Sequence, residues 1–107
     1  MRRGTTPTHV FRVKADLNNL EALYVTYQQH KVNLVEKTLD DVTVDTENNT
    51  VTVQLTQADT LKFDDKNCTC PENMVKIQIR WRYTDGNAAA TKVLSVRATE
   101  ILKDGEI

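Results

Sequence analysis

The stretch Val75-Lys76-Ile77-Gln78-Ile79-Arg80-Trp81-Arg82-Tyr83 decides the fold class of this chain. Apolar side chains occupy every second position, and polar or basic side chains occupy the positions between them. A period of two is typical of a β-strand that buries one face and exposes the other. We therefore expect Trp81 and Tyr83 in the core, and Arg80 and Arg82 on an exposed, basic face.

The same alternation extends in shorter runs along the rest of the chain. Turn residues separate the runs: His30-Lys31 connects two of them, and Asp85-Gly86 is a strong hairpin signal. Val32, Leu34 and Val35 fall on both faces of their strand, so its orientation stays open. The expected strands cover residues 9–14, 21–29, 32–37, 42–44, 50–55, 75–83 and 88–96. Their expected inward positions include Phe11, Val13, Leu23, Val25, Tyr27, Val51, Val53, Leu55, Leu94 and Val96.

One short helical segment interrupts the strands. Thr56 resembles a helix N-cap, because an acidic residue, Asp59, follows three positions later. We expect about one helical turn here, with Leu61 or Phe63 packed under the sheet. Residues 64–73 then form the one long loop.

These elements predict an all-β fold: a small antiparallel β-sandwich, Ig-like or Greek-key, of about seven strands with one short helical turn. A small Greek-key barrel is the alternative, and the sequence does not set the strand order. Residues 1–7 show no periodicity and are interpreted as a basic N-terminal arm. Residues 8–107 form a single sandwich domain, because a chain of 107 residues can bury one core without a metal or a disulfide.

The charge balance disfavours some classes of partner. Lys and Arg number 14 and Asp and Glu 15, for a net charge of -1, so the chain as a whole is not attracted to nucleic acid or to an acidic membrane. No apolar run approaches the ~20 residues of a membrane-spanning helix, and no signal-peptide core follows Met1. We expect a protein made in the cytoplasm, with neither nucleic acid nor a membrane as its partner.

No group of residues predicts an enzyme. The only serine, Ser95, lies within a strand pattern, and only His9 and His30 could serve as its base. Asp40-Asp41 and Asp64-Asp65 are interpreted as solvated turn residues, since the spacing of a calcium loop is missing. The chain also lacks a Gly-rich phosphate loop. We expect no catalytic residue, no cofactor, no metal site and no small-molecule ligand.

Two cysteines, Cys68 and Cys70, lie one residue apart in the expected long loop. A disulfide between them would close a very small, strained ring. A four-ligand metal site would need both histidines, which are distant in sequence. Two reduced thiols are therefore the expected state.

The candidate contact residues lie at the two ends of the chain and on the basic strand face. That face is not a stacking platform for single-stranded nucleic acid, because alternation separates its arginines from the aromatic side chains. Free chain ends normally fray unless something holds them. We therefore expect that the ends either add to their own sheet or dock on neighbouring copies by strand addition. The candidate interface residues are Arg2, Arg3, Thr5, Thr6, Pro7, Arg80, Arg82, Ile101, Leu102 and Ile107.

Four segments together resemble one group of proteins: Met1-Arg2-Arg3-Gly4-Thr5-Thr6-Pro7-Thr8, Leu55-Thr56-Gln57-Ala58-Asp59-Thr60-Leu61, Ile77-Gln78-Ile79-Arg80 and Ile101-Leu102-Lys103-Asp104-Gly105. The group comprises short proteins encoded in phages and prophages of gut-dwelling Firmicutes, where they accompany virion structural genes. The opening Thr-x-Pro-Thr-x-x-Phe pattern is also similar to the first strand of the N-terminal domains of phage upper baseplate proteins. Residues 64–73 depart from the group's shorter loop, which argues further against a shared metal site.

The resemblance implies a non-enzymatic virion component of the tail, baseplate or connector, made in the cytoplasm of the host bacterium. Its implied partners are copies of itself and other virion structural proteins, in symmetric arrangement. Residues 2–8 and 101–107 would be the contact elements, and deletion of residues 1–7 would leave a folded monomer that no longer assembles. Two alternatives stay open: a capsid decoration protein, and a carbohydrate- or host-surface-binding module with Tyr24 as its exposed aromatic residue.

Overall fold

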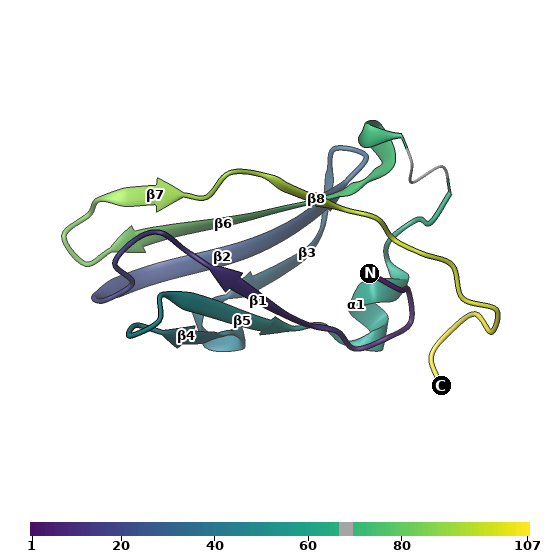
Figure 1. Cartoon of the computed structure of the whole chain (residues 1–107), viewed down its shortest axis with the longest axis horizontal. Coiled ribbons are helices and arrows are strands. Elements are labelled where there is room, and N and C mark those ends of the chain that lie inside the picture. The colour runs from purple at the N-terminus through teal and green to yellow at the C-terminus, as the bar shows by residue number, and fades with distance from the viewer. Residues whose placement is uncertain (67–69) are drawn as a thin grey trace.

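Two antiparallel β-sheets face each other, and one helical turn, α1, lies between them at one end (Figure 1). The computed structural model describes residues 1–66 and 70–107. Within this part of the chain the helix α1 spans Gln57–Leu61, and short 3-10 turns span Leu39–Asp41 and Pro71–Asn73. The strands are β1 (Thr8–Arg12), β2 (Leu20–Gln29), β3 (Val32–Thr38), β4 (Thr43–Asp45), β5 (Thr50–Gln54), β6 (Val75–Tyr83), β7 (Ala88–Ala90) and β8 (Leu94–Val96). The predicted all-β sandwich is confirmed.

The larger sheet has the order β3-β2-β6-β7, and β8 continues the β7 edge by pairing with the other half of β6. The smaller sheet has the order β1-β5-β4. The turn between β2 and β3 is the predicted hairpin, and both of its residues, His30 and Lys31, have positive φ. This conformation matches the twist of the flanking strands.

The core forms where the inner faces of the two sheets meet. β6 alternates as predicted: Val75, Ile77, Ile79 and Trp81 are buried, while Tyr83 is half-buried at the strand end. The opposing sheet contributes mainly the side chains of β5. The buried core residues from the other elements are Val13, Leu17, Leu23, Val25, Tyr27, Val35, Val51, Val53, Leu55, Phe63 and Ala98. Burying each large apolar side chain is worth roughly 1.5–3 kcal/mol, so this inter-sheet layer is the main source of stability.

Two irregular pairings explain where the sequence pattern was ambiguous. In β3, Val35 pairs with Tyr27 but Asn33 pairs with Gln28, so Leu34 is an extra residue. A bulge of this kind switches the side-chain alternation from one face to the other. This switch explains why the apolar residues Val32, Leu34 and Val35 fall on both faces of the strand in the sequence pattern.

A second irregularity divides the last predicted strand into β7 and β8, so that the sandwich has eight strands instead of about seven. Residues 91–93 lie opposite only Gln78 and Ile79, because Ala90 pairs with Arg80 and Leu94 pairs with Ile77. The predicted core position of Leu94 is wrong in part: the residue pairs with the inward-facing Ile77 but is 48% exposed, since no described strand lies beyond it at this sheet edge. Val96 is half-buried against the core.

The helix α1 joins the two layers through an ion pair. As the sequence predicted, Thr56 caps the helix: its hydroxyl accepts a hydrogen bond from the Asp59 amide, and the Asp59 carboxylate accepts one from the Thr56 amide at 2.9 Å. The same carboxylate contacts Lys37 Nζ of β3 at 2.8 Å. Burial alone would raise the pKa of Asp59, but hydrogen bonds from Lys37 and Thr56 and the lysine charge lower it below its usual range.

Replacing Asp59 by alanine is expected to lower the free energy of unfolding by about 2 kcal/mol, because the helix loses its cap and Lys37 loses its partner. Asp41→Ala is the matched control, since Asp41 also accepts hydrogen bonds from a threonine three positions earlier, but in an exposed turn. Urea titrations of both variants should show the smaller loss for Asp41→Ala. Equal losses would contradict a role for the ion pair with Lys37.

Stability is also expected to depend on pH through His9. Its Nδ1 lies 2.7 Å from the hydroxyl of the buried Tyr27. Burial, and to a lesser extent the positive N-terminus, lowers the pKa of His9 below the ordinary value of 6.5. The unfolded chain therefore takes up this proton at a higher pH than the folded chain does. The free energy of unfolding should consequently fall as the pH drops below 6.5 toward the folded-state pKa.

Urea titrations across this pH range test the prediction. His9→Gln should remove the decrease, whereas His30→Gln, a substitution in the exposed hairpin turn, should retain it. A wild-type stability that stays constant between about pH 7 and 5 would contradict it.

Candidate functional site

An open cleft lies where the two sheets part along one side of the sandwich. It has a volume of about 740 Å³ and is lined by residues 10–15, the inner face of β6, residues 89–92 and Leu94. We call it the edge cleft. Its walls include β1, in the lower layer of Figure 1, and β7 and β8, in the upper layer.

Both walls of the edge cleft are sheet edges. β1 pairs with β5 on one side and has no strand partner on the other among the described residues. Val10 on this strand is 62% exposed, and Leu94 on the opposite wall is half exposed. Unpaired strand edges beside exposed apolar side chains are the usual acceptors for an additional strand.

Trp81 lines the edge cleft with part of its ring. Its indole Nε1 is buried beneath this surface and has no hydrogen-bond partner in the described residues. A buried donor without a partner costs about 1–3 kcal/mol. Arg12, Lys14 and Lys92 make the lining basic.

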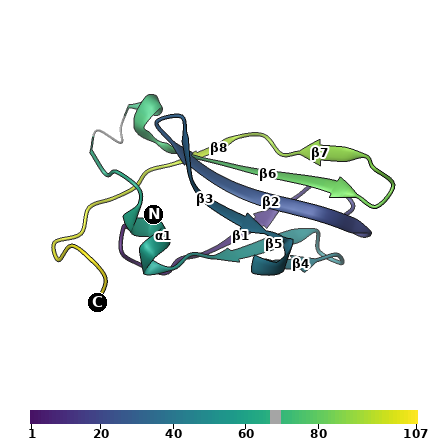
Figure 2. The ribbon, with the colours of Figure 1, turned by 180° about the vertical axis from the view of Figure 1, so that it is seen from behind.

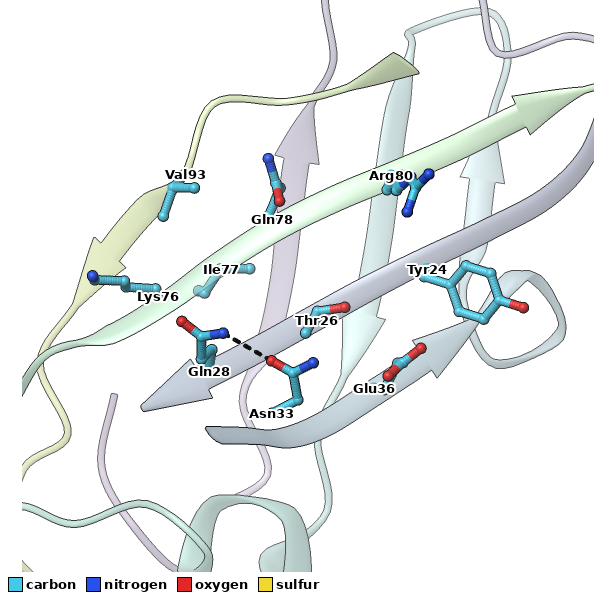
Figure 3. Close-up of a pocket in the computed structure, with 10 residues that line it drawn as sticks. All are labelled: Tyr24, Thr26, Gln28, Asn33, Glu36, Lys76, Ile77, Gln78, Arg80 and Val93. Carbon is cyan, nitrogen blue, oxygen red and sulfur yellow. Dashed lines mark hydrogen bonds between the residues drawn. The ribbon is translucent and has the colours of Figure 1, made fainter. Parts of the chain in front are cut away.

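A second, shallower hollow of about 670 Å³ lies on the outer face of the larger sheet (Figure 3). Thr26, Gln28 and Gln78 line it, and the Gln28 amide donates to Asn33 Oδ1 at 3.0 Å. Tyr24 stands at one end of this outer hollow and is 43% exposed. The combination of one exposed aromatic ring with amide and hydroxyl groups suits a hydroxyl-rich ligand.

The two candidate arginines of β6 lie on this outer face, as the alternation predicted. Arg80 borders the outer hollow and makes no ion pair with the described residues (Figure 3). Arg82 Nε lies 3.3 Å from a carboxylate oxygen of Glu21, and both side chains are about half exposed. A pair this exposed contributes at most about 1 kcal/mol, so Arg82 is available for other contacts.

The N-terminal arm is held by its own chain. The Arg3 amide donates to the Thr99 carbonyl, and the Thr99 amide donates to the Met1 carbonyl, at 3.1 and 2.8 Å. Further along, the Leu55 amide donates to the Pro7 carbonyl at 3.0 Å. The alternative in which the chain ends pair within their own fold therefore describes residues 1–3 and 97–99.

Side chains tie the arm to α1 as well. The Thr60 hydroxyl donates to the Thr5 carbonyl at 2.9 Å, and Arg3 donates to the Leu61 carbonyl at 3.3 Å. Arg3 also lies 3.7 Å from Asp65 and 3.7 Å from Asp104. Of the candidate interface residues in the arm, Arg3 and Pro7 are half-buried, whereas Arg2, Thr5 and Thr6 are exposed.

The candidate residues at the other end separate into two groups. Ile101 is half-buried, and Gly4 with its positive φ faces it so closely that a Cβ at position 4 would lie 2.8 Å from Ile101 Cδ1. Leu102 is 100% and Ile107 is 91% exposed. The chain is thus anchored up to Ile101, and residues 102–107, which we call the tail, lie outside the packed fold. Both termini lie beside the α1 end of the sandwich (Figure 2).

A cluster of acidic, histidine and cysteine side chains could bind a metal ion. Within residues 1–66 and 70–107, no three His, Cys, Asp or Glu side chains are grouped as metal ligands. Cys70 is exposed, and Cys68 lies outside the described residues, so the predicted state of the pair is not addressed. None of the helices described is long and apolar enough to cross a membrane.

Comparison with known proteins adds no identification to this geometry. No protein-family model matches the chain, and neither a curated protein nor a solved structure matches it.

Proposed function

We propose that the protein is a non-enzymatic structural component of a phage virion that acts through repeated protein-protein contacts. The observation that carries this proposal is the edge cleft, in which an unpaired strand edge, exposed apolar side chains and an unsatisfied buried indole occur together. A monomer that functions alone normally covers such an edge, and the basic side chains beside this one, Arg12, Lys14 and Lys92, favour an acidic partner segment. The resemblance of the sequence to phage and prophage proteins supplies the virion setting, in the tail, baseplate or connector or as a capsid decoration protein.

Purified phage particles that encode this chain provide the test. Mass spectrometry of particles freed of soluble protein should detect it in a constant ratio to the other virion proteins. Val10→Glu, which places a charge on the free edge of β1, should reduce its incorporation, while Val32→Glu, at a comparably exposed position on β3, should not. Particles that lack the wild-type protein would contradict the proposal.

A second function, binding of a carbohydrate or host-surface glycan, is favoured by the outer hollow. Tyr24 can stack on a sugar ring while the amides of Gln28, Asn33 and Gln78 hydrogen-bond to its hydroxyl groups. Under this function, the wild-type protein binds members of a glycan array and Tyr24→Ala abolishes that binding. Because Tyr24 is 43% exposed and lies on the central strand β2, the substitution should lower the free energy of unfolding by about 1 kcal/mol, which leaves the protein folded.

Val10→Ala is the matched control for the glycan prediction, since it also removes an exposed apolar side chain but lies at the edge cleft. It should retain binding. An array without any glycan signal, or binding that survives Tyr24→Ala, would eliminate the outer hollow as a glycan site.

A further inference from the structure

We propose that the tail of one copy, residues 102–107, docks as an added strand in the edge cleft of the next copy. The inference rests on the proposed function, because it names the partner that fills the cleft. It assigns two distinct surfaces to one contact, so each copy carries one donor segment and one acceptor cleft.

The acceptor side is prepared for an extended backbone. The free edge of β1 offers amide and carbonyl groups that β5 does not use. On the facing wall Leu94 is uncovered, and the buried ring of Trp81 lines the cleft. An added strand would pair with β1 and cover Leu94.

Charge selects the occupant. The cleft lining carries Arg12, Lys14 and Lys92 and none of the acidic side chains. The tail, residues 102–107, reads Leu-Lys-Asp-Gly-Glu-Ile, with two acidic side chains and one basic one. A two-fold contact between the clefts of two copies would instead bring Arg12, Lys14 and Lys92 of one copy close to the same residues of the other. This is unfavourable because like charges repel.

The tail also provides apolar anchors that its own chain leaves unused. Leu102 and Ile107 are almost fully exposed. They are separated by five residue steps, which span about 17 Å in an extended chain. Residues 10–15 of the cleft wall span the same number of steps. The two anchors can therefore reach opposite ends of the cleft.

Backbone geometry permits both anchors to face the cleft. In a regular strand Leu102 and Ile107 would point to opposite faces, because their spacing is odd. Gly105 lies between them with a φ of +85°, a conformation that suits the glycine of a β-bulge. A bulge there shifts the alternation by one residue and puts both side chains on one face.

The tail can leave its present position at little cost. Among the described residues, its polar contacts with the rest of the chain are the Arg3–Asp104 pair at 3.7 Å and two exposed hydrogen bonds between Gln57 and the Ile107 backbone. Exposed pairs of this kind are worth at most about 1 kcal/mol. The hydrogen bonds of Thr99 to the arm keep the preceding segment anchored. Because donor and acceptor are different surfaces, the contact is head-to-tail and generates a ring or a filament.

Mixing two variants tests the head-to-tail arrangement. The tail variant carries Leu102→Ser and Ile107→Ser, and the cleft variant carries Leu94→Glu. Sedimentation velocity of the wild type at concentrations up to about 1 mM, where even weak association is visible, should show oligomers. Each variant alone should be monomeric, and their equimolar mixture should form heterodimers and nothing larger. Val32→Ser, an exposed substitution on β3, should associate like the wild type.

Trp81 is the only tryptophan, so its fluorescence reports occupancy of the cleft without reliance on the cleft variant. A peptide of residues 100–107 should shift the emission of the tail variant in a saturable way, and a peptide with both anchors replaced by serine should not. A tail variant that still associates, a mixture that stays monomeric, a monomeric wild type or an unresponsive Trp81 would each overturn the inference. Incorporation of the protein into particles is measured separately, so the proposed function can be correct even if the tail does not dock in the cleft.

Discussion

Replacing Phe63 by alanine is expected to lower the free energy of unfolding by about 3–5 kcal/mol. Phe63 follows α1, is 1% exposed, and packs its ring against Tyr27 of β2 with 6.1 Å between ring centroids. Truncation would leave a cavity between the helical turn and the larger sheet. For a domain of about 100 residues, this loss lowers the melting temperature by more than 10 °C.

Leu61→Ala is the control for this substitution, because Leu61 belongs to the same helical turn but is only half-buried. It should cost clearly less in the same urea and thermal titrations. A loss of under about 1 kcal/mol for Phe63→Ala would mean that α1 does not close the core as described.

Deletion of residues 1–7 is expected to destabilise the fold by about 3 kcal/mol. The sequence suggested a dispensable arm, but the deletion removes the carbonyl of Pro7, which accepts from the buried Leu55 amide, and that of Thr5, which accepts from the buried Thr60 hydroxyl. A buried amide without its partner costs about 1–3 kcal/mol, whereas the Thr60 hydroxyl keeps the more distant carbonyls of Gln57 and Thr56 at 3.3 and 3.4 Å. The ion pair of Arg3 with Asp65 is lost as well.

Unfolding titrations of the truncated and full-length chains measure this effect. Arg2→Ala is the comparison, because Arg2 is exposed and its side chain donates a hydrogen bond to the exposed Glu100 carbonyl. It should leave stability within about 0.5 kcal/mol. A truncated chain as stable as the full-length one would restore the original interpretation of the arm as a contact element without a part in the fold.

The elements predictable from sequence are those in which neighbouring residues carry the signal. β6 alternates over its whole length, and Thr56 and Asp59 form a capping box within one turn. The bulges at Leu34 and at residues 91–93 were not predictable, since an extra residue in one strand is defined only against its partner strand. The position of Leu94 at an open edge has the same cause.

The candidate site depends even more on distant parts of the chain. Arg80 and Arg82 were proposed as contact residues from strand alternation and Leu102 from its place at the chain end, and the structure puts them on the outer face and in the tail. The edge cleft was not foreseen, because residues 10–15 and 89–94 become its walls only when the two sheets pack. The one signal available in the sequence was Val10, an apolar residue at an outward position between the inward residues of β1.

We propose that this sandwich functions as one of many identical copies in contact. Electron cryomicroscopy of purified particles should show several symmetry-related copies, with the edge cleft of each one covered by a neighbouring chain. A single copy per particle, or copies whose β1 edges and edge clefts all face solvent, would contradict it.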